Sequence, residues 1–309
     1  MTTIGLVGCG RWGKLIARDL VALGTDVVAV CRDDTTRANA QQAGVDRIVT
    51  SVAELGPVDG VVVATQTSAH SDAILEAAAL KVPIFTEKPM TNNVEHARML
   101  LETLGDRLFV MDKWRYHHGV LALREVGMSG RLGPIQGVTT SRVGGKLIYD
   151  DIDATWALLP HELVIGFEIL GSIGLPRSAS AVRNGTRIVQ MTAKLGDAPW
   201  HQLEVSSIGH NFARQIELVC ELGQAWIPDP YADHIALREW EWPENQIEKI
   251  PVSIEMPLLA ELAAFVAFVR GQGPPPKSSA AEGLVVVETI DALCRMSDTS
   301  AVKSAAASA

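Results

Sequence analysis

The sequence predicts an α/β protein with two domains: an N-terminal doubly wound parallel sheet, and a C-terminal α+β domain with an open, mostly antiparallel sheet. The chain has 309 residues, about twice the usual length of one domain. Its first part alternates short Val- and Ile-rich runs with helical segments, a pattern typical of βαβ units. Its second part places longer strand-like runs between Gly and Asn-Gly turns, which favours antiparallel pairing. We therefore expect domains over residues 1–113 and 114–309.

In the first domain, each expected strand is a short apolar run and each expected helix follows a turn. The run Gly60-Val-Val-Val-Ala64 is apolar throughout, as in strands covered by helices on both faces. Several helical segments begin at Ser, Thr or Asn, which are natural N-caps. The expected strands are 3–7, 26–30, 47–49, 60–64, 83–86 and 108–111, and the expected helices are 12–23, 35–43, 70–80 and 94–104.

In the second domain, turn-forming residues separate most of the expected elements. A helix over 120–126 precedes the turn sequence Ser129-Gly-Arg-Leu-Gly-Pro134. The helix expected over 160–170 starts at Pro160, a residue favoured at the first helical position. The expected strands are 135–142, 179–182, 186–194, 201–206, 214–221 and 224–227, and helices over 256–270 and 280–295 close the chain.

Composition excludes several classes of protein. The 27 basic and 36 acidic residues give a net charge of −9, which disfavours nucleic acid or anionic lipid as the main partner. No apolar stretch is long enough to span a membrane, and no signal peptide is visible, so we expect a cytoplasmic protein. The four cysteines form no CxxC pair, so neither a disulfide framework nor a structural metal site is expected.

A glycine motif joins the first expected strand to the first expected helix. Gly8-Cys-Gly10-Arg11-Trp12-Gly13 is G-x-G-x-x-G, the phosphate-binding turn of a Rossmann dinucleotide domain. The first glycine permits the tight turn, the second lets a pyrophosphate approach the backbone, and the third allows close packing of helix on strand. A glycine-rich turn without a ligand is the alternative. We expect all five named residues to line a cofactor site.

The end of the second strand determines the choice between NAD and NADP. An acidic residue usually binds the ribose hydroxyls of NAD at this position, but here Arg32 occupies it. A guanidinium can pair with a 2′-phosphate and stack on adenine, which favours NADP. NAD stays possible if Asp33 or Asp34 reaches the ribose instead.

The tripeptide Glu87-Lys88-Pro89 follows the fifth expected strand, and together with the glycine motif it resembles the Gfo/Idh/MocA oxidoreductases. The resemblance covers nearly the whole chain. It includes the loop 64–70, the segments 115–118 and 129–133, and Pro160-His161-Glu162-Leu163. The segments 156–163 and 214–220 are most similar to the branch that acts on sugar nucleotides and ketosugars. The resemblance implies that Thr65, Glu87 and Lys88 contribute to the cofactor site.

The chain departs from the family pattern at one position. The family places a catalytic Asp four residues before the His, and here that position is Ala157. Asp153 and Glu162 are nearby in sequence, but neither is at the matching site. This change affects the expected substrate contacts and acid–base machinery, and it leaves the expected cofactor site intact.

His161 and Lys88 are the candidate catalytic residues. A histidine whose pKa lies near the operating pH can take the hydroxyl proton in oxidation and return it in reduction. A lysine at the carboxyl end of a strand can polarise a carbonyl and stabilise an alkoxide. The structural alternatives are a core histidine and a surface turn. Arg115, Tyr116 and Tyr149 are candidate substrate contacts, with interdomain packing or a plain connecting loop as the alternative.

The leading hypothesis is an NADP-dependent oxidoreductase that acts on a hydroxyl or keto carbon of a sugar, sugar nucleotide or cyclitol. One alternative is an imine or biliverdin-type reductase of the same fold, and another is a non-catalytic NAD(P)-binding regulator. Ala157 keeps both alternatives open, whereas the presence of both Lys88 and His161 argues against a regulator. We also expect a homodimer or homotetramer formed through the exposed face of the C-terminal sheet, because large bare sheet faces rarely stay in water.

Overall fold

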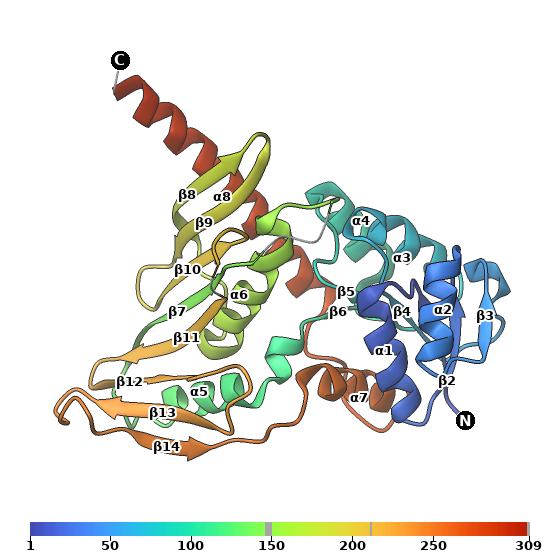
Figure 1. Cartoon of the computed structure of the whole chain (residues 1–309), viewed down its shortest axis with the longest axis horizontal. Helices are drawn as coiled ribbons and strands as arrows, with labels where there is room; N and C mark the ends of the chain where they lie inside the picture. Colours follow the sequence, from blue (N-terminus) through green and yellow to red (C-terminus); the bar gives the residue numbers. More distant parts are fainter. Residues whose placement is uncertain (146–149, 211, 308–309) are drawn as a thin grey trace. The chain divides into compact units, whose positions relative to one another are not determined.

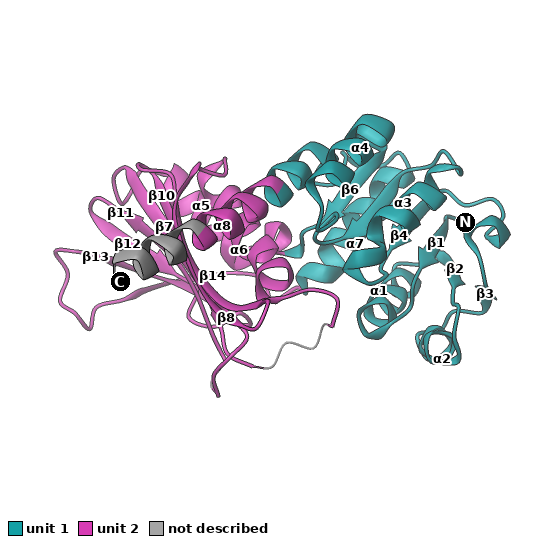
Figure 2. Cartoon of the chain, turned by 90° about the horizontal axis from the view of Figure 1, so that it is seen from above, with its two compact units in different colours: residues 1–113, 256–287 teal, residues 114–255, 288–309 magenta. Residues whose placement is uncertain are grey.

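A computed structural model describes residues 1–145, 150–210 and 212–307, with side chains up to residue 298. The chain folds into two compact units, shown in Figure 2. Unit 1 consists of Met1–Lys113 together with Met256–Val287, and unit 2 consists of Trp114–Glu255 together with Glu288–Ala309.

Unit 1 is built on a parallel six-stranded sheet with the order β3-β2-β1-β4-β5-β6. The order reverses beside β1, and such a switch point is where open α/β sheets bind ligands. Figure 1 shows these strands in colours from blue to teal. The strands are β1 (Thr3–Val7), β2 (Asp26–Val30), β3 (Arg47–Val49), β4 (Gly60–Val63), β5 (Ile84–Glu87) and β6 (Leu108–Met111). The helices are α1 (Arg11–Ala22), α2 (Asp34–Gln42), α3 (His70–Ala78), α4 (Val94–Leu104) and α7 (Pro257–Val269), with short 3₁₀ turns at Val52–Glu54, Thr67–Ala69 and Gly105–Arg107.

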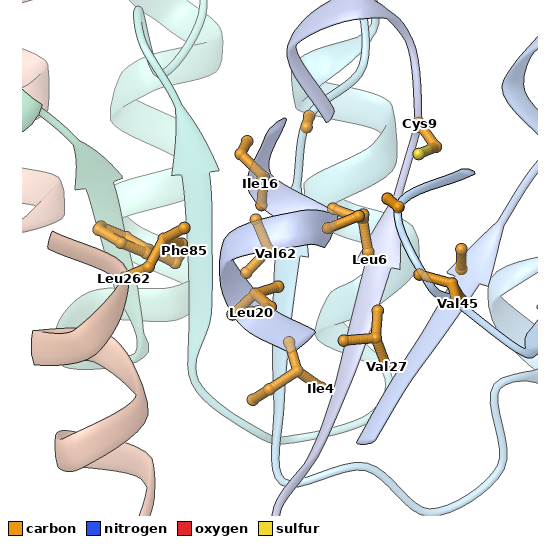
Figure 3. Packing of buried hydrophobic residues seen from close by; sticks show 14 of the residues in the cluster. Ile4, Leu6, Cys9, Ile16, Leu20, Val27, Val45, Val62, Phe85 and Leu262 are labelled. Carbon is orange, nitrogen blue, oxygen red and sulfur yellow. The ribbon is translucent and has the colours of Figure 1, made fainter. Parts of the chain in front are cut away.

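Apolar side chains from the sheet and from α1 and α7 form the core of unit 1 (Figure 3). Ile16 and Leu20 of α1 are fully buried in this cluster. On α7, Phe265 stacks on Phe85 of β5 with ring centroids 4.9 Å apart. A Cβ atom on Gly60 would lie 3.0 Å from the Phe265 ring, so the glycine lets α7 pack closely on the sheet.

The observed units differ from the expected domains in one segment. Residues 256–287 belong to unit 1, whereas the sequence analysis placed all of 114–309 in the second domain. The physical reason is the apolar surface of α7, whose buried side chains complete the core described above. The helix α8 (Ala280–Ala307) begins in unit 1 and continues into unit 2.

Unit 2 contains an eight-stranded sheet with the order β14-β13-β12-β11-β7-β10-β9-β8. Its pairings are antiparallel except for the parallel pair β7–β10, which confirms the expected mostly antiparallel sheet. The strands are β7 (Ile135–Val143), β8 (Pro176–Asn184), β9 (Arg187–Leu195), β10 (Trp200–Ser206), β11 (Ala213–Cys220), β12 (Gly223–Trp226), β13 (His234–Glu239) and β14 (Glu248–Pro251). The helices are α5 (His118–Met128) and α6 (Ala154–Leu170), and a 3₁₀ turn at Lys113–Tyr116 leads into the unit.

The two helices α5 and α6 cover the same face of this sheet. Val138 of β7 pairs with Leu218 and with His201, so all three side chains share one face. Gly127 of α5 packs on Leu218, and Gly166 of α6 packs on the His201 ring. The opposite face carries mostly polar side chains that are exposed or half-buried: Thr139, Ser141, Gln202, Glu204, Gln215 and Glu217.

Two features of unit 2 correct the sequence analysis. The helix expected to start at Pro160 starts at Ala154, and the proline lies inside it. Asp153 is the N-cap, and its Oδ1 accepts hydrogen bonds from the backbone N–H groups of Thr155 and Trp156 at 3.0 and 3.4 Å. The strands β13 and β14 were not expected. They are short and pair at one edge of the sheet, and β14 has no buried residue.

Candidate active site

The glycine motif forms the turn from β1 into α1, and two of its glycines are required by the protein itself. Gly8 has a φ of +91°, and a Cβ atom there would lie 2.8 Å from the Ala64 carbonyl oxygen. A Cβ atom on Gly13 would collide with the carbonyl oxygen of Gly8. These contacts hold the start of α1 close to the ends of β1 and β4.

Gly10 has a different environment. A Cβ atom on this residue would meet nothing within 4 Å, so no protein contact explains the glycine. Gly10 is also the N-cap of α1 and provides no side-chain cap to the first turn. An open approach to the N–H groups of a helix start fits the phosphates of a dinucleotide. Arg11 is exposed at the first helical position beside it.

At the end of β2, Arg32 is exposed and forms an ion pair with Glu76 of α3 at 3.1 Å. Exposed pairs of this kind contribute little to stability, so a ligand can replace Glu76 at low cost. Asp33 instead caps α2, because its Oδ1 accepts a hydrogen bond from the Thr36 N–H at 2.8 Å. That bond lowers the pKa of Asp33. Asp33, one of the two acidic residues that could reach the ribose of NAD, is therefore already engaged as the cap of α2.

Glu87 ties the Glu87-Lys88-Pro89 turn to the glycine motif. One of its carboxylate oxygens accepts a hydrogen bond from the Trp12 indole N–H, and the other accepts the Lys88 backbone N–H at 3.1 Å. The Lys113 ammonium lies 4.4 Å from the centroid of the Trp12 ring. Burial raises the pKa of Glu87, while the nearby Lys88, Trp12 and Lys113 act in the opposite direction. The expected cofactor contact Trp12 is thus engaged with Glu87, and Lys88 is half-buried beside it.

His70 links the loop after β4 to the loop after β5, and the sequence analysis did not assign it a role. Its ring is buried, with Nδ1 2.8 Å from the Pro89 carbonyl oxygen and Nε2 3.2 Å from the Thr65 carbonyl oxygen. Thr65 and the residue after Lys88 are therefore held by one side chain. The only sequence signal was the position of His70 in the segment that resembles the family loop.

Glu261 of α7 is a second residue that the sequence analysis missed. It is fully buried, and its Oε2 has no hydrogen-bond partner among the residues that the structure describes. Burial, and then the charges of Glu87 and Asp112, raise its pKa well above the ordinary value. Its environment therefore favours the neutral form of this carboxyl group, and it lies close enough to Glu87 for their charges to interact. No sequence signal marked it, because it is one acidic residue in an otherwise apolar helix.

In unit 2, His161 lies near the middle of α6 and is half-buried. Ala157, one turn earlier, is buried and places no polar group there. Glu162 is paired with Arg142 of β7, whose Nε donates to the Glu162 Oε1 at 2.6 Å. Asp153 caps α6 and also accepts the Ile188 N–H at 3.1 Å. Both nearby carboxylates are engaged elsewhere, so neither replaces the acid missing at position 157.

The candidate substrate contacts are in different settings. Arg115 is buried, forms an ion pair with Glu168 at 3.0 Å and lies over the Phe167 ring, which favours its packing role. Tyr116 is half-buried at the end of the 3₁₀ turn, and Tyr149 lies outside the described residues.

In the part of the chain that the structure describes, no three His, Cys, Asp or Glu side chains are grouped to hold a metal ion. No helix described is long and apolar enough to cross a bilayer.

Unit 1 therefore gathers the glycine motif, Thr65 and the Glu87–Lys88 turn at the carboxyl ends of β1, β4 and β5. The fold and this site define a dinucleotide-binding oxidoreductase.

Comparisons with known proteins agree with this class. A sequence profile described as "Oxidoreductase family, NAD-binding Rossmann fold" matches residues 2–108. Inositol 2-dehydrogenase of Cereibacter sphaeroides is 30% identical over 256 residues, which are 74% of each chain. The structure of UDP-N-acetylglucosamine 3-dehydrogenase from Acidithiobacillus ferrooxidans has a TM-score of 0.80 at 21% identity, covering 94% of this chain and 96% of that one. Levoglucosan dehydrogenase in complex with NADH and levoglucosan has a TM-score of 0.83 at 15% identity, covering 96% and 97%.

The chain belongs to the Gfo/Idh/MocA family, and it is an NAD(P)-dependent oxidoreductase. The chain has the same fold as these solved structures.

Proposed function

We propose that this protein transfers a hydride between NADP and a hydroxyl or keto carbon of a sugar, sugar nucleotide or cyclitol. The observation that carries the proposal is the joint placement of Gly10 and the Glu87–Lys88 turn at one edge of the parallel sheet. The names of the relatives support the substrate class, since they act on inositol, a sugar nucleotide and levoglucosan.

The residues of unit 1 fit a bound dinucleotide. The turn Gly8–Gly13 would receive the pyrophosphate, and Arg32 would pair with the 2′-phosphate of NADP. Thr65 would line the same edge, where its carbonyl oxygen is held by His70. The nicotinamide supplies the hydride acceptor for oxidation and the hydride donor for reduction.

Lys88 and His161 carry the polar part of the reaction in this proposal. The imidazole of His161 accepts the proton of the substrate hydroxyl in oxidation and returns it to the oxygen in reduction. A cation such as the ammonium of Lys88 stabilises the negative charge that develops on a substrate oxygen. The backbone N–H of Lys88 is held by the buried Glu87, which fixes the start of the lysine turn.

A second candidate function is reduction of an imine or a biliverdin-like ring, and a non-catalytic regulator is the third. Buried Ala157 favours these readings, because that turn of α6 offers no carboxylate to a sugar hydroxyl. The half-buried placement of both Lys88 and His161 favours turnover over a purely regulatory role.

Turnover of single variants tests the proposal. We expect His161→Ala to lose about 10²–10⁴-fold in kcat on a sugar or cyclitol substrate, the usual effect of removing a general acid–base. NADPH affinity, measured by fluorescence titration, should stay unchanged in this variant. Lys88→Ala should also lower kcat, because the reacting oxygen loses its cation.

The matched controls are His234→Ala, whose ring pairs with Asp233 in unit 2, and Lys81→Ala, an exposed lysine of unit 1. Both controls should keep wild-type kcat. Full turnover by His161→Ala on a sugar or cyclitol would remove the proton-transfer assignment. Activity on imines alone would favour the second candidate.

A further inference from the structure

Two arginines of unit 2 stand directly opposite each other on neighbouring strands. Arg142 of β7 pairs in register with Arg214 of β11, so both side chains project from the face that α5 and α6 cover. Both guanidinium groups lie over the Trp114 ring, at 5.0 and 5.8 Å from its centroid. We call Arg142, Arg214 and Trp114 the arginine pair and its platform.

The charges around the pair are uneven. Arg142 is nearly buried and its Nε donates to Glu162, which is itself buried. Arg214 is exposed, and partial burial together with the charge of Arg142 lowers its pKa. Tyr231, Glu162 and Asp229 act in the opposite direction. Of these, Glu162 is bonded to Arg142, and Asp229 Oδ1 accepts the Tyr231 backbone N–H at 2.9 Å.

Like charges directly opposite each other in a sheet are unfavourable. Arg142 is compensated by its bond to Glu162, whereas Arg214 is placed against another cation. The arrangement therefore favours a negatively charged group that both guanidinium groups can reach. Planar guanidinium groups suit this purpose, because they bind carboxylate and phosphate oxygens through paired hydrogen bonds.

We propose that the arginine pair receives an anionic group, a carboxylate or a phosphate, on the substrate of this oxidoreductase. This rests on the proposed function, and it narrows the substrate from sugars in general to negatively charged sugar derivatives. Glu162 follows His161 in α6, so the bond from Arg142 to Glu162 holds the pair beside the helix turn that carries the candidate proton-transfer group. Trp114 is buried and stacks on His117, so its ring is a fixed support for the two guanidinium groups.

Binding of three related probes to the NADP-loaded protein tests the proposal. D-glucose, D-glucuronate and D-glucose 6-phosphate share one ring and differ by the absence of charge, a carboxylate and a phosphate. Calorimetry should show at least one anion binding about 10–100-fold more tightly than glucose, the range expected for charge-assisted hydrogen bonds. The better of the two anions identifies the group that the pair prefers.

The variants assign that preference to the pair. Arg214→Gln should abolish the anion preference and leave glucose binding unchanged, whereas Arg214→Lys should keep part of it. Arg142→Gln combined with Glu162→Gln removes the second guanidinium without leaving a buried unpaired charge, and it should have the same effect. The control is Arg177→Gln, which removes an exposed arginine of β8 that pairs with Asp197.

Equal binding of all three probes, no detectable binding of either anion, or an anion preference that survives Arg214→Gln would overturn the proposal. Arg214-dependent anion binding without hydride transfer to any sugar or cyclitol keeps the anion receptor and removes the proposed function. If the protein turns over neutral sugars and Arg214→Gln has no effect, the proposed function is kept and the anion receptor is removed.

Discussion

We propose that the choice between NADP and NAD depends on Arg32. Its ion pair with Glu76 is exposed on both sides, so a phosphate can take the place of the carboxylate. We expect NADPH to bind more tightly than NADH. Arg32→Asp should weaken NADPH binding by about 1.5–3 kcal/mol, the size of a charge-assisted hydrogen bond. Fluorescence titration of both cofactors measures this difference.

The control for this experiment is Arg18→Asp, which changes an exposed arginine on α1 that pairs with Asp19. It should leave the ratio of the two affinities as in the wild type. Equal affinity of the unmutated protein for NADPH and NADH would contradict the prediction.

Residues whose role depends only on the conformation of the nearby backbone could be predicted from the sequence. The spacing of Gly8, Gly10 and Gly13 follows from one turn between a strand and a helix, so it can be read directly. The bond from Trp12 to Glu87 joins residues from different elements, and no local pattern predicts it. The same holds for His70, whose two carbonyl partners come from separate loops.

At the scale of elements, a buried histidine of β10 packs under α6 and makes the folding stability of the protein depend on pH. His201 of β10 packs against Gly166, and its Nε2 lies 2.9 Å from the Thr140 hydroxyl. Burial lowers the pKa of His201 to about 4. In the unfolded chain the pKa is ordinary, near 6.5. Between these two values the unfolded state binds more protons, so stability falls as the pH is lowered from about 6.5 to 4.

We expect this group to contribute a loss on the order of 3 kcal/mol in the free energy of unfolding across that range. His201→Gln keeps a hydrogen-bonding partner for Thr140 and removes the titration. Urea unfolding of both proteins at several pH values measures the difference. The wild type should lose more stability than the variant on acidification, and parallel curves would exclude His201 as the source.

The elements of unit 1 were predicted closely, because most of its strands are buried apolar runs between clear helix signals. β1, β2, β3 and β6 begin and end where the sequence analysis placed them. In unit 2 the start of α6 was misplaced, because Pro160 is typical of a first helical turn and here lies inside the helix. The true start depends on the Asp153 cap and on packing that fixes the helix around the proline.

For the whole molecule, we predict association through the polar face of the eight-stranded sheet. Trp200 and Trp226 lie half-buried on this face among Gln, Thr and Glu side chains, and tryptophan is enriched at protein interfaces. Light scattering at micromolar concentration should give a mass of at least twice the 33.2 kDa of one chain. Thr139→Arg should lower the mass, because symmetric association brings two added charges together.

Met99→Arg, which alters an exposed position of α4 in unit 1, is the control and should leave the mass unchanged. A monomer for the unmutated protein would contradict this prediction.

The division of the chain into units differs from the sequence-based expectation for residues 256–287, which belong to unit 1. An apolar helix pattern shows that α7 is buried, but it does not show which sheet the helix covers.

The split of unit 1 affects how the chain folds during synthesis. The ribosome makes residues 114–255 before it makes α7. Phe85 therefore cannot stack on Phe265 until most of the protein has been synthesised. The nucleotide-binding unit therefore cannot finish folding as an independent N-terminal domain, and its closure spans a long intervening segment. A premature stop after residue 255 would remove α7 from unit 1 as well as the part of α8 that belongs to unit 2, so damage near the end of the gene would also affect the structure encoded at its beginning.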